Sequence, residues 1–166
     1  MIRSLKRRSF LRQSTLAAGS VLAGFPTIIP GSALGKGGRP APSERLTLGC
    51  IGTGNNGINW LRNFMGDKRI QVVAVCDVNK ESDGYWADGL GGREPAKRIA
   101  EEKYGEGIRT YEDFREVLAR QDIDAVQIAT PDHWHGIQVI LAAQAGKHIY
   151  GQKPLSLTVQ EGRKMS

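Results

Sequence analysis

Short runs of β-branched and apolar residues alternate with longer amphipathic stretches from residue 45 onward. Such short runs predict strands, whereas apolar residues that recur every three or four positions predict helices. Strands and helices in turn favour βαβ units, and therefore an α/β domain with a parallel sheet. The strands are expected at 46–51, 71–76, 108–110, 125–129 and 148–150.

Helices are expected between these strands and after the last one. The glycine-rich stretch 79–94 is expected to be a long loop, and Pro95 suits the first turn of a helix, where a missing N–H costs nothing. Capping patterns are present at Thr110-x-x-Asp113 and Thr158-x-x-Glu161. The expected helices are 56–65, 95–103, a segment with Phe114, Val117 and Leu118, 134–145, and the residues after Thr158.

Positive charge is concentrated at the N-terminus, although the whole chain carries only +6. Residues 1–43 hold seven basic side chains and no acidic one, whereas the rest holds 16 basic and 17 acidic ones. A nucleic-acid-binding surface needs lysine and arginine gathered on a folded face. The near-neutral folded part therefore argues against a nucleic-acid partner.

The basic N-terminal segment has the layout of an export signal. Residues 6–12, Lys-Arg-Arg-Ser-Phe-Leu-Arg, precede a mildly apolar stretch at 14–29 and small, helix-breaking residues at 30–35. Paired arginines followed by Phe-Leu resemble the bacterial twin-arginine signal, with Lys6 where Ser or Thr is usual. That resemblance implies periplasmic export of a protein that is already folded. A basic amphipathic tail is the alternative, although its glycines and proline would weaken a helix.

We divide the chain into a signal peptide at 1–34, a linker at 35–44 and a folded domain at 45–166. A stable membrane anchor is not expected, because no run of 18 or more apolar residues occurs and no cysteine precedes Cys50. Cys50 and Cys76 fall in the first two expected strands, where buried apolar thiols are favoured. Neighbouring parallel strands seldom give disulfide geometry. A disulfide between the two cysteines is nevertheless an alternative if the protein enters an oxidising compartment.

The clearest chemical signal is Gly52-Thr53-Gly54-Asn55-Asn56-Gly57, a G-x-G-x-x-G between an expected strand and an expected helix. Its glycines permit a tight turn, close approach of a pyrophosphate and close helix–strand packing. The N–H groups at the helix start attract phosphate charge. Asp77 ends the second strand, where a carboxylate accepts hydrogen bonds from an adenosine ribose and repels a 2′-phosphate. A dinucleotide site that prefers NAD to NADP is therefore expected; a tight turn with an exposed aspartate is the alternative.

Two further clusters follow the fourth and fifth strands, at the edge where ligands sit in open α/β sheets. The first is Thr130-Pro131-Asp132-His133-Trp134-His135, in which either histidine suits a ligand role or a capping role equally, and the tryptophan suits packing. The second is Tyr150-Gly151-Gln152-Lys153-Pro154. A lysine there can hydrogen-bond a substrate hydroxyl and transfer a proton, although an ordinary surface lysine is the alternative. Three scattered histidines do not make a metal site.

These pieces, in this order, resemble the glucose-fructose oxidoreductase / inositol dehydrogenase / MocA family (Gfo/Idh/MocA), especially its exported bacterial members. The resemblance runs from about Leu46 to the end of the chain and includes Val72-Val73-Ala74-Val75-Cys76-Asp77 and Lys153-Pro154-Leu155. It implies a Rossmann-type doubly wound parallel sheet that binds NAD(P), followed by a C-terminal α/β domain that holds a sugar or polyol. We expect the sheet to be truncated after the fifth strand and the C-terminal domain to be absent.

The resemblance also assigns residues. Lys153 matches the lysine of the family's Glu-Lys-Pro motif and is the expected catalytic residue, while Gln152 departs from the family by replacing the glutamate. Pro131 and His135 match the turn after the fourth strand. The expected cofactor-binding residues are Gly52, Thr53, Gly54, Asn55, Asn56, Gly57, Asp77, Thr130, Pro131, His135, Gln152 and Lys153.

Three functions are compatible with this sequence. The leading hypothesis is the cofactor domain of an exported enzyme that transfers hydride between NAD and a sugar or polyol hydroxyl. The second is glycoside cleavage by transient oxidation with tightly held NAD, and the third is a dinucleotide-binding module without catalysis. The sequence leaves the substrate's identity open and is compatible with a homo-oligomer.

Overall fold

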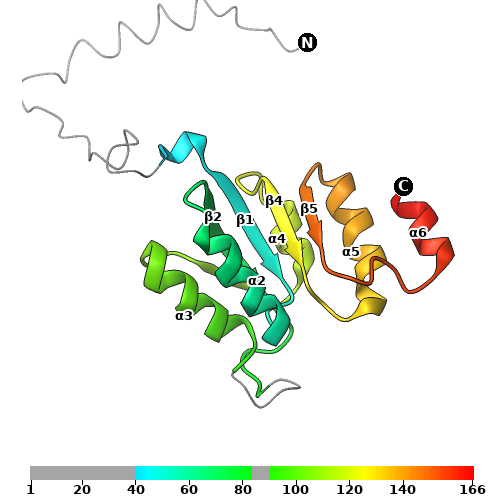
Figure 1. The fold of residues 1–166 in the computed structure, drawn as a ribbon, viewed down its shortest axis with the longest axis horizontal. Coiled ribbons are helices and arrows are strands. Elements are labelled where there is room, and N and C mark those ends of the chain that lie inside the picture. Colours follow the sequence, from blue (N-terminus) through cyan, green and yellow to red (C-terminus); the bar gives the residue numbers. More distant parts are fainter. Residues whose placement is uncertain (1–39, 84–89) are drawn as a thin grey trace, which may run out of the picture.

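Five parallel strands form one sheet in the order β3-β2-β1-β4-β5 (Figure 1). The computed structural model describes residues 40–83 and 90–166. The Rossmann-like α/β fold that the sequence predicts is confirmed. The strands are β1 Leu46–Ile51, β2 Ile70–Cys76, β3 Arg109–Tyr111, β4 Ala125–Ile128 and β5 His148–Gly151.

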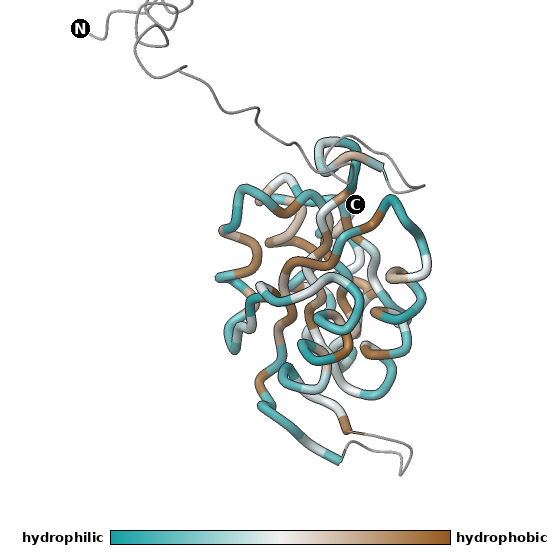
Figure 2. The backbone as a smooth tube through the Cα atoms, turned by 90° about the vertical axis from the view of Figure 1, so that its left-hand side faces the viewer, coloured by the Kyte–Doolittle hydropathy of each residue, from teal (hydrophilic) through white to brown (hydrophobic). Residues whose placement is uncertain are grey.

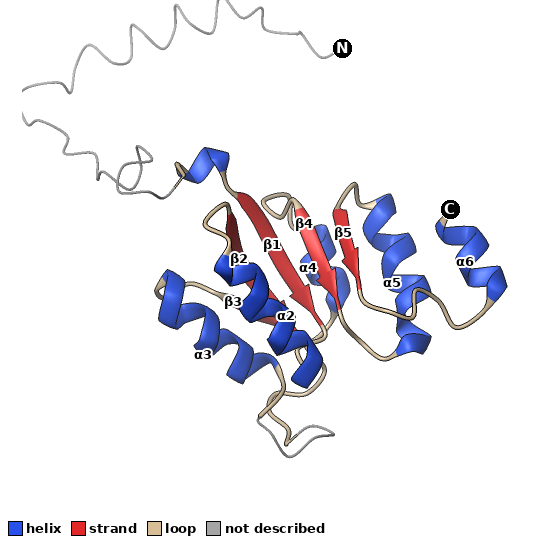
Figure 3. Ribbon diagram, viewed as in Figure 1, coloured by secondary structure: helices blue, strands red, loops and turns tan. Residues whose placement is uncertain are grey.

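Helices cover both faces of the sheet (Figure 3). The side chains of α2 and α3 pack on one face, and those of α4 and α5 pack on the other. The last helix, α6, packs against α5 instead of the sheet. The helices are α2 Asn55–Gly66, α3 Arg93–Tyr104, α4 Phe114–Ala119, α5 Asp132–Gln144 and α6 Val159–Met165, with a 3₁₀ turn, η3, at Pro42–Glu44.

Each face of the sheet has its own apolar core. Leu61 of α2 is fully buried against Val72 and neighbouring residues on one face, and Val117 of α4 is fully buried near Ile128 on the other. Burying one such side chain stabilises the fold by about 1.5–3 kcal/mol. Figure 2 accordingly shows hydrophobic positions running through the middle of the domain, with hydrophilic positions in its outer turns.

β2 contains an irregularity that the sequence pattern does not reveal. Leu48 of β1 pairs with Val72, but the next residue pairs with Ala74, so Val73 is an extra residue in β2. Because of this bulge, Val72 and Val75 face the core under α2 and α3, whereas Val73 and Ala74 face the opposite core.

Two expected helix starts are wrong. The helix expected from Pro95 begins at Arg93, because the N–H groups of Arg93 and Glu94 donate to the carbonyl oxygens of Asn79 and Lys80. These bonds satisfy donors that a first helical turn otherwise leaves open. The helix expected from residue 134 begins two residues earlier, at Asp132.

The capping of two other helices could be predicted in part. Asp113, and not Thr110, caps α4, because the Asp113 side chain accepts a hydrogen bond from Arg115 N at 2.9 Å. Thr110 lies in β3. The capping box expected at Thr158 and Glu161 is confirmed at the start of α6.

Several expectations fall on residues outside the described part of the chain. The signal peptide at 1–34, most of the linker at 35–44, and residues 84–89 of the expected long loop are among them. The described end of the linker is not wholly irregular, because Pro42–Glu44 form η3. Within 40–83 and 90–166, none of the helices combines the length and apolar character that crossing a membrane requires.

Cys50 and Cys76 lie on opposite faces of the sheet, which confirms the interpretation as buried free thiols. In the β1–β2 register, Cys50 pairs with Val75, and Cys76 pairs with Ile51. Since successive side chains alternate between faces, the two sulfurs cannot meet. Burial raises the pKa of the Cys50 thiol to about 12. Burial, together with the nearby negative charge of Asp77, raises the pKa of the Cys76 thiol to about 12 as well.

We expect neither thiol to react with a disulfide reagent such as DTNB in the native protein at pH 8. The thiolate is the reactive form, and both pKa values lie far above that pH. Colour release should therefore follow unfolding, with both thiols titrating promptly in guanidinium chloride. Rapid reaction of one or two thiols in the native protein would contradict the burial described here.

Candidate functional site

The expected site residues lie at the carboxyl ends of four strands. β1 and β4 are neighbours at the centre of the sheet, but β1 leads to β2 on one side and β4 leads to β5 on the other. The strand order therefore reverses between β1 and β4. In open α/β sheets, ligands bind outside the carboxyl ends of the strands at such a reversal.

The segment that leads from β1 into the first turn of α2, residues 52–57, is fixed by two glycines in close contact with backbone. Gly52 has φ +81°, and a Cβ atom there would lie 2.7 Å from the backbone N of Thr130. A Cβ atom at Gly57 would overlap the carbonyl oxygen of Gly52. The N–H of Gly52 also donates to Cys76 O at 2.8 Å, which ties the turn to β2. We call residues 52–57 the phosphate turn.

Gly54 differs from its two motif partners. It is the N-cap of α2, with φ −66°, and a Cβ atom there would meet none of the described residues within 4 Å. Packing within the described part of the chain therefore does not require glycine at this position. Space beside the positive end of a 12-residue helix fits the approach of a pyrophosphate. The residues present thus fit the phosphate part of a dinucleotide.

Asp77 is bonded to the phosphate turn across 24 positions of sequence. Its Oδ2 accepts from Thr53 N at 2.7 Å, and its Oδ1 accepts from Asn79 N at 2.9 Å. Thr53 is fully buried, with its hydroxyl 3.5 Å from the same Oδ2. A carboxylate has about four lone-pair positions. Asp77 therefore retains acceptor capacity for ribose hydroxyls while it holds the turn.

His135 joins the segments that follow β4 and β5. Its Nε2 lies 2.8 Å from Thr130 O, and its Nδ1 contacts Pro154 O. The ring is only 2% exposed. Thr130 is held further by its hydroxyl, which donates to Oε1 of the buried Gln138 at 2.6 Å. His135 thus fixes the turn after β4 and the lysine-containing segment after β5 relative to each other.

The other residues of this cluster are more open to solvent. Pro131, the N-cap of α5, is exposed, and so is His133, whose Nδ1 lies 3.5 Å from Asp132. Trp134 is 42% exposed, with its ring packed edge-on against Phe114. The packing role expected for Trp134 is consistent with this contact.

Lys153 has an exposed side chain at the carboxyl end of β5. The preceding residue, Gln152, is held by its N–H, which donates to Ile128 O at 2.9 Å. The Gln152 side-chain oxygen accepts from the main-chain N–H of Lys153 at 2.8 Å. The Lys153–Pro154 peptide bond is cis. The amide that replaces the family's glutamate therefore bonds the lysine's backbone.

Sequence reasoning did not include three residues that hold the phosphate turn. Gln127 is fully buried in β4, and its Nε2 donates to Gly57 O at 3.1 Å in the first turn of α2. Its Oε1 makes no hydrogen bond among the described residues. A lone polar residue in an apolar strand was the available signal. Arg93 donates from Nη1 to Asp77 O at 2.9 Å, and Gly92 N donates to Thr53 O at 2.8 Å.

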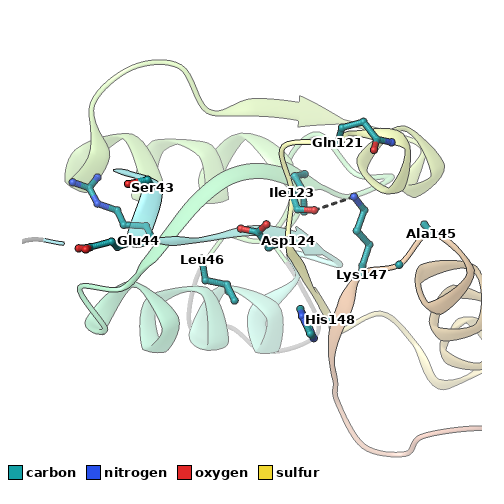
Figure 4. Close-up of a pocket in the computed structure, with 11 residues that line it drawn as sticks. Ser43, Glu44, Leu46, Gln121, Ile123, Asp124, Ala145, Lys147 and His148 are labelled. Carbon is teal, nitrogen blue, oxygen red and sulfur yellow. Dashed lines mark hydrogen bonds between the residues drawn. The ribbon is translucent and has the colours of Figure 1, made fainter. Parts of the chain in front are cut away.

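A shallow hollow lies at the opposite, amino-terminal edge of the sheet (Figure 4). It has a volume of about 550 Å³ and is lined by residues that include Leu46, Asp124, Lys147 and His148. Its charged groups already have partners: Lys147 Nζ donates to Ile123 O at 2.9 Å, and Asp124 accepts from Thr47 N at 2.8 Å. The Thr47 bonds lower the pKa of the Asp124 carboxyl. The hollow therefore stands apart from the candidate site.

No group of three or more histidine, cysteine, aspartate or glutamate side chains is placed to hold a metal ion in the described ranges 40–83 and 90–166.

Residues 46–166 match the Gfo/Idh/MocA family, described as an oxidoreductase family with an NAD-binding Rossmann fold. The chain belongs to this family. The match confirms the resemblance drawn from the motifs and covers the whole sheet and all the site residues named above. The described domain is therefore the NAD-binding Rossmann domain of an oxidoreductase-family protein.

Curated relatives carry enzyme names. A glycosyl hydrolase family 109 protein of Saccharopolyspora erythraea is 33% identical over 170 residues, which covers 93% of this chain and 34% of the relative. An alpha-N-acetylgalactosaminidase of Shewanella oneidensis is 30% identical over 174 residues, covering 95% and 35% respectively. The chain thus spans about a third of the length of the curated relatives it matches.

A solved structure gives the same fold. The WlbA dehydrogenase from Bordetella pertussis, in complex with NADH and UDP-GlcNAcA, superposes with a TM-score of 0.56 at 27% identity. The superposition covers 73% of this chain and 32% of the dehydrogenase. This similarity supports assigning the described part to a dehydrogenase-type cofactor domain.

The surroundings of two glycines predict different effects of the same substitution within α2. Gly57→Ala should lower the free energy of unfolding by about 2 kcal/mol or more, because the new methyl overlaps Gly52 O. Gly66→Ala, where a Cβ atom meets nothing, should stay within about 1 kcal/mol of the wild type. Urea unfolding followed by circular dichroism measures both. Equal stabilities of the two variants would contradict the close packing of the phosphate turn.

Proposed function

We propose that the protein is an NAD-dependent oxidoreductase that transfers hydride between the nicotinamide and a hydroxyl of a sugar or polyol. One observation carries the proposal: the open space over Gly54 lies beside the Asp77-bonded turn, at the reversal point of the sheet. Family membership supports NAD as the group that this space takes.

The chain's own residues divide the cofactor between them. The phosphate turn and the start of α2 would take the pyrophosphate, and the Asp77 carboxylate would accept from the adenosine ribose hydroxyls. The segments after β4 and β5, which include Thr130 and Gln152, would line the nicotinamide side. Bound nicotinamide supplies the hydride donor or acceptor.

NAD is favoured over NADP by charge. Asp77 is a carboxylate at the position where NADP would carry a 2′-phosphate, and the two negative charges repel. The guanidinium of Arg93, at the start of α3, is engaged with the main chain, because its Nη1 donates to the carbonyl oxygens of Asp77 and Val78 at 2.9 and 3.0 Å. The WlbA dehydrogenase, one of the similar solved structures, is in complex with NADH.

Lys153 is the proposed catalytic residue. Its exposed side chain can hydrogen-bond the substrate oxygen. As the hydroxyl becomes a carbonyl, the neutral amine would accept the hydroxyl proton, and in the reverse reduction the ammonium would donate it to the new hydroxyl. His135, through Pro154 O and Thr130 O, would keep the lysine segment in a constant place beside the cofactor. Further contacts with the substrate would come from elsewhere in the protein, since the curated relatives are about three times as long as this chain.

Glycoside cleavage by transient oxidation is the second candidate. The names of the curated relatives favour it, since they are a glycosyl hydrolase family 109 protein and an alpha-N-acetylgalactosaminidase. It would use the same cofactor site, because it also begins with hydride transfer from a sugar carbon. A module without catalysis has no such support among these relatives.

Export is part of the proposal. The basic segment at 6–12 and the apolar stretch at 14–29 support a twin-arginine signal peptide at 1–34 and a periplasmic protein. A protein exported by that route would fold, and load its cofactor, before translocation.

Gly54→Ala separates cofactor binding from folding. The apo protein should keep its thermal midpoint, because the methyl meets none of residues 40–83 and 90–166. NADH affinity should fall by about tenfold or more, because the methyl obstructs the pyrophosphate. Fluorescence titration with NADH, and competition by NAD and NADP, measures both affinity and preference. Absence of dinucleotide binding by the wild type would refute the proposed function.

Lys153→Ala tests catalysis in the full-length protein. It should lower kcat by about two to four orders of magnitude and weaken NADH binding far less, because the lysine acts chiefly on the substrate oxygen although it also lies among the expected cofactor-binding residues. A panel of sugars, polyols and aryl glycosides is assayed for NADH and for released aglycone. Net NADH formation identifies the dehydrogenase, aglycone release without NADH identifies the glycosidase, and full activity of the variant excludes the lysine's role.

A further inference from the structure

Gly91 and Gly92 lie outside the G-x-G-x-x-G motif, yet they contact it directly. Gly92 N donates to Thr53 O at 2.8 Å. A Cβ atom at Gly91 would lie 3.1 Å from the Cα of Gly54 and 3.6 Å from the backbone N of Asn55. These atoms belong to the part of the phosphate turn that approaches a pyrophosphate.

Backbone bonds hold the two glycines in this place. Ser82 N donates to Gly91 O at 2.9 Å, and Gly91 N donates to Ser82 O at 2.7 Å, forming an antiparallel bridge. Gly92 has φ +110°, and a Cβ atom there would lie 2.8 Å from Lys80 O. We call Ser82, Gly91 and Gly92 the glycine clasp.

The glycine clasp and Asp77 both form hydrogen bonds with the backbone of Thr53. Thr53 donates through its N–H to Asp77 and accepts through its carbonyl oxygen from Gly92. Arg93, the next residue, donates back to Asp77 O. The phosphate turn, the end of β2 and the start of α3 are therefore linked in a closed circuit of hydrogen bonds.

We propose that the glycine clasp is a positioning element for the dinucleotide, which sets where the Gly54–Asn55 peptide presents itself to the pyrophosphate. This inference rests on the proposed function. A backbone N–H bonds a charged group best when it is already held in the position that the bound group requires. A Cβ atom at Gly91 would press on the Gly54 backbone, which cannot turn aside as a flexible side chain would.

The test compares two ligands in three variants. ADP-ribose contains the pyrophosphate, whereas adenosine lacks it. The affinity of each ligand is measured by its displacement of bound NADH, followed by NADH fluorescence. Gly91→Ala should lower the affinity for ADP-ribose about tenfold, as expected for one impaired hydrogen bond to a charged group. The affinity for adenosine should stay within about twofold of the wild type. Gly66→Ala is the matched control, because its methyl meets nothing, and should leave both affinities unchanged.

Ser82→Pro provides a second route to the same result if Gly91→Ala fails to fold. It removes the N–H that donates to Gly91 O and lies outside both apolar cores. It too should weaken ADP-ribose selectively. Unchanged ADP-ribose affinity in a folded variant, or equal weakening of ADP-ribose and adenosine, would overturn the clasp. Failure of the wild type to bind either NADH or ADP-ribose would instead overturn the proposed function on which the clasp depends.

Discussion

The carboxylate of Asp77 is the constraint on which the candidate site depends. It reaches from the end of β2 to the backbone N–H of Thr53, and thereby determines the path of the chain immediately after β1. Such a charge-assisted bond is stronger than one between neutral groups. The close contacts of Gly52 and Gly57 lie on that path, and Gln127 supports the first turn of α2 that follows. A residue that sequence alone marks as a ligand for ribose is thus also part of the scaffold.

Local patterns in the sequence predicted most of the fold, because the spacing of apolar residues and the capping residues identify each element from its own segment. Period and composition located all five strands, and the capping box at Thr158 located α6. The errors arose where long-range contacts decide. Arg93 starts α3 early because carbonyl groups of residues 79 and 80 meet its first turn, and the bulge at Val73 depends on pairing with β1. Neither contact leaves a trace in the spacing of apolar residues.

The candidate site shows the same division. The glycine motif, Asp77 and Lys153 could be named from sequence because glycine spacing and strand ends report directly on a turn and an edge. The supports of the site could not, since Gln127, Arg93 and Gly91 each act on a residue far away in the chain. His135 was undecided between two roles, and its burial between Thr130 and Pro154 makes it a link between the two halves of the site.

The placement of the two cysteines on opposite faces of the sheet has a consequence for biogenesis. A domain whose sulfurs cannot pair needs no oxidant, isomerase or correct pairing step to reach its final state. Its assembly is insensitive to the redox potential of its surroundings. The same tertiary structure is therefore available in a reducing compartment and in an oxidising one.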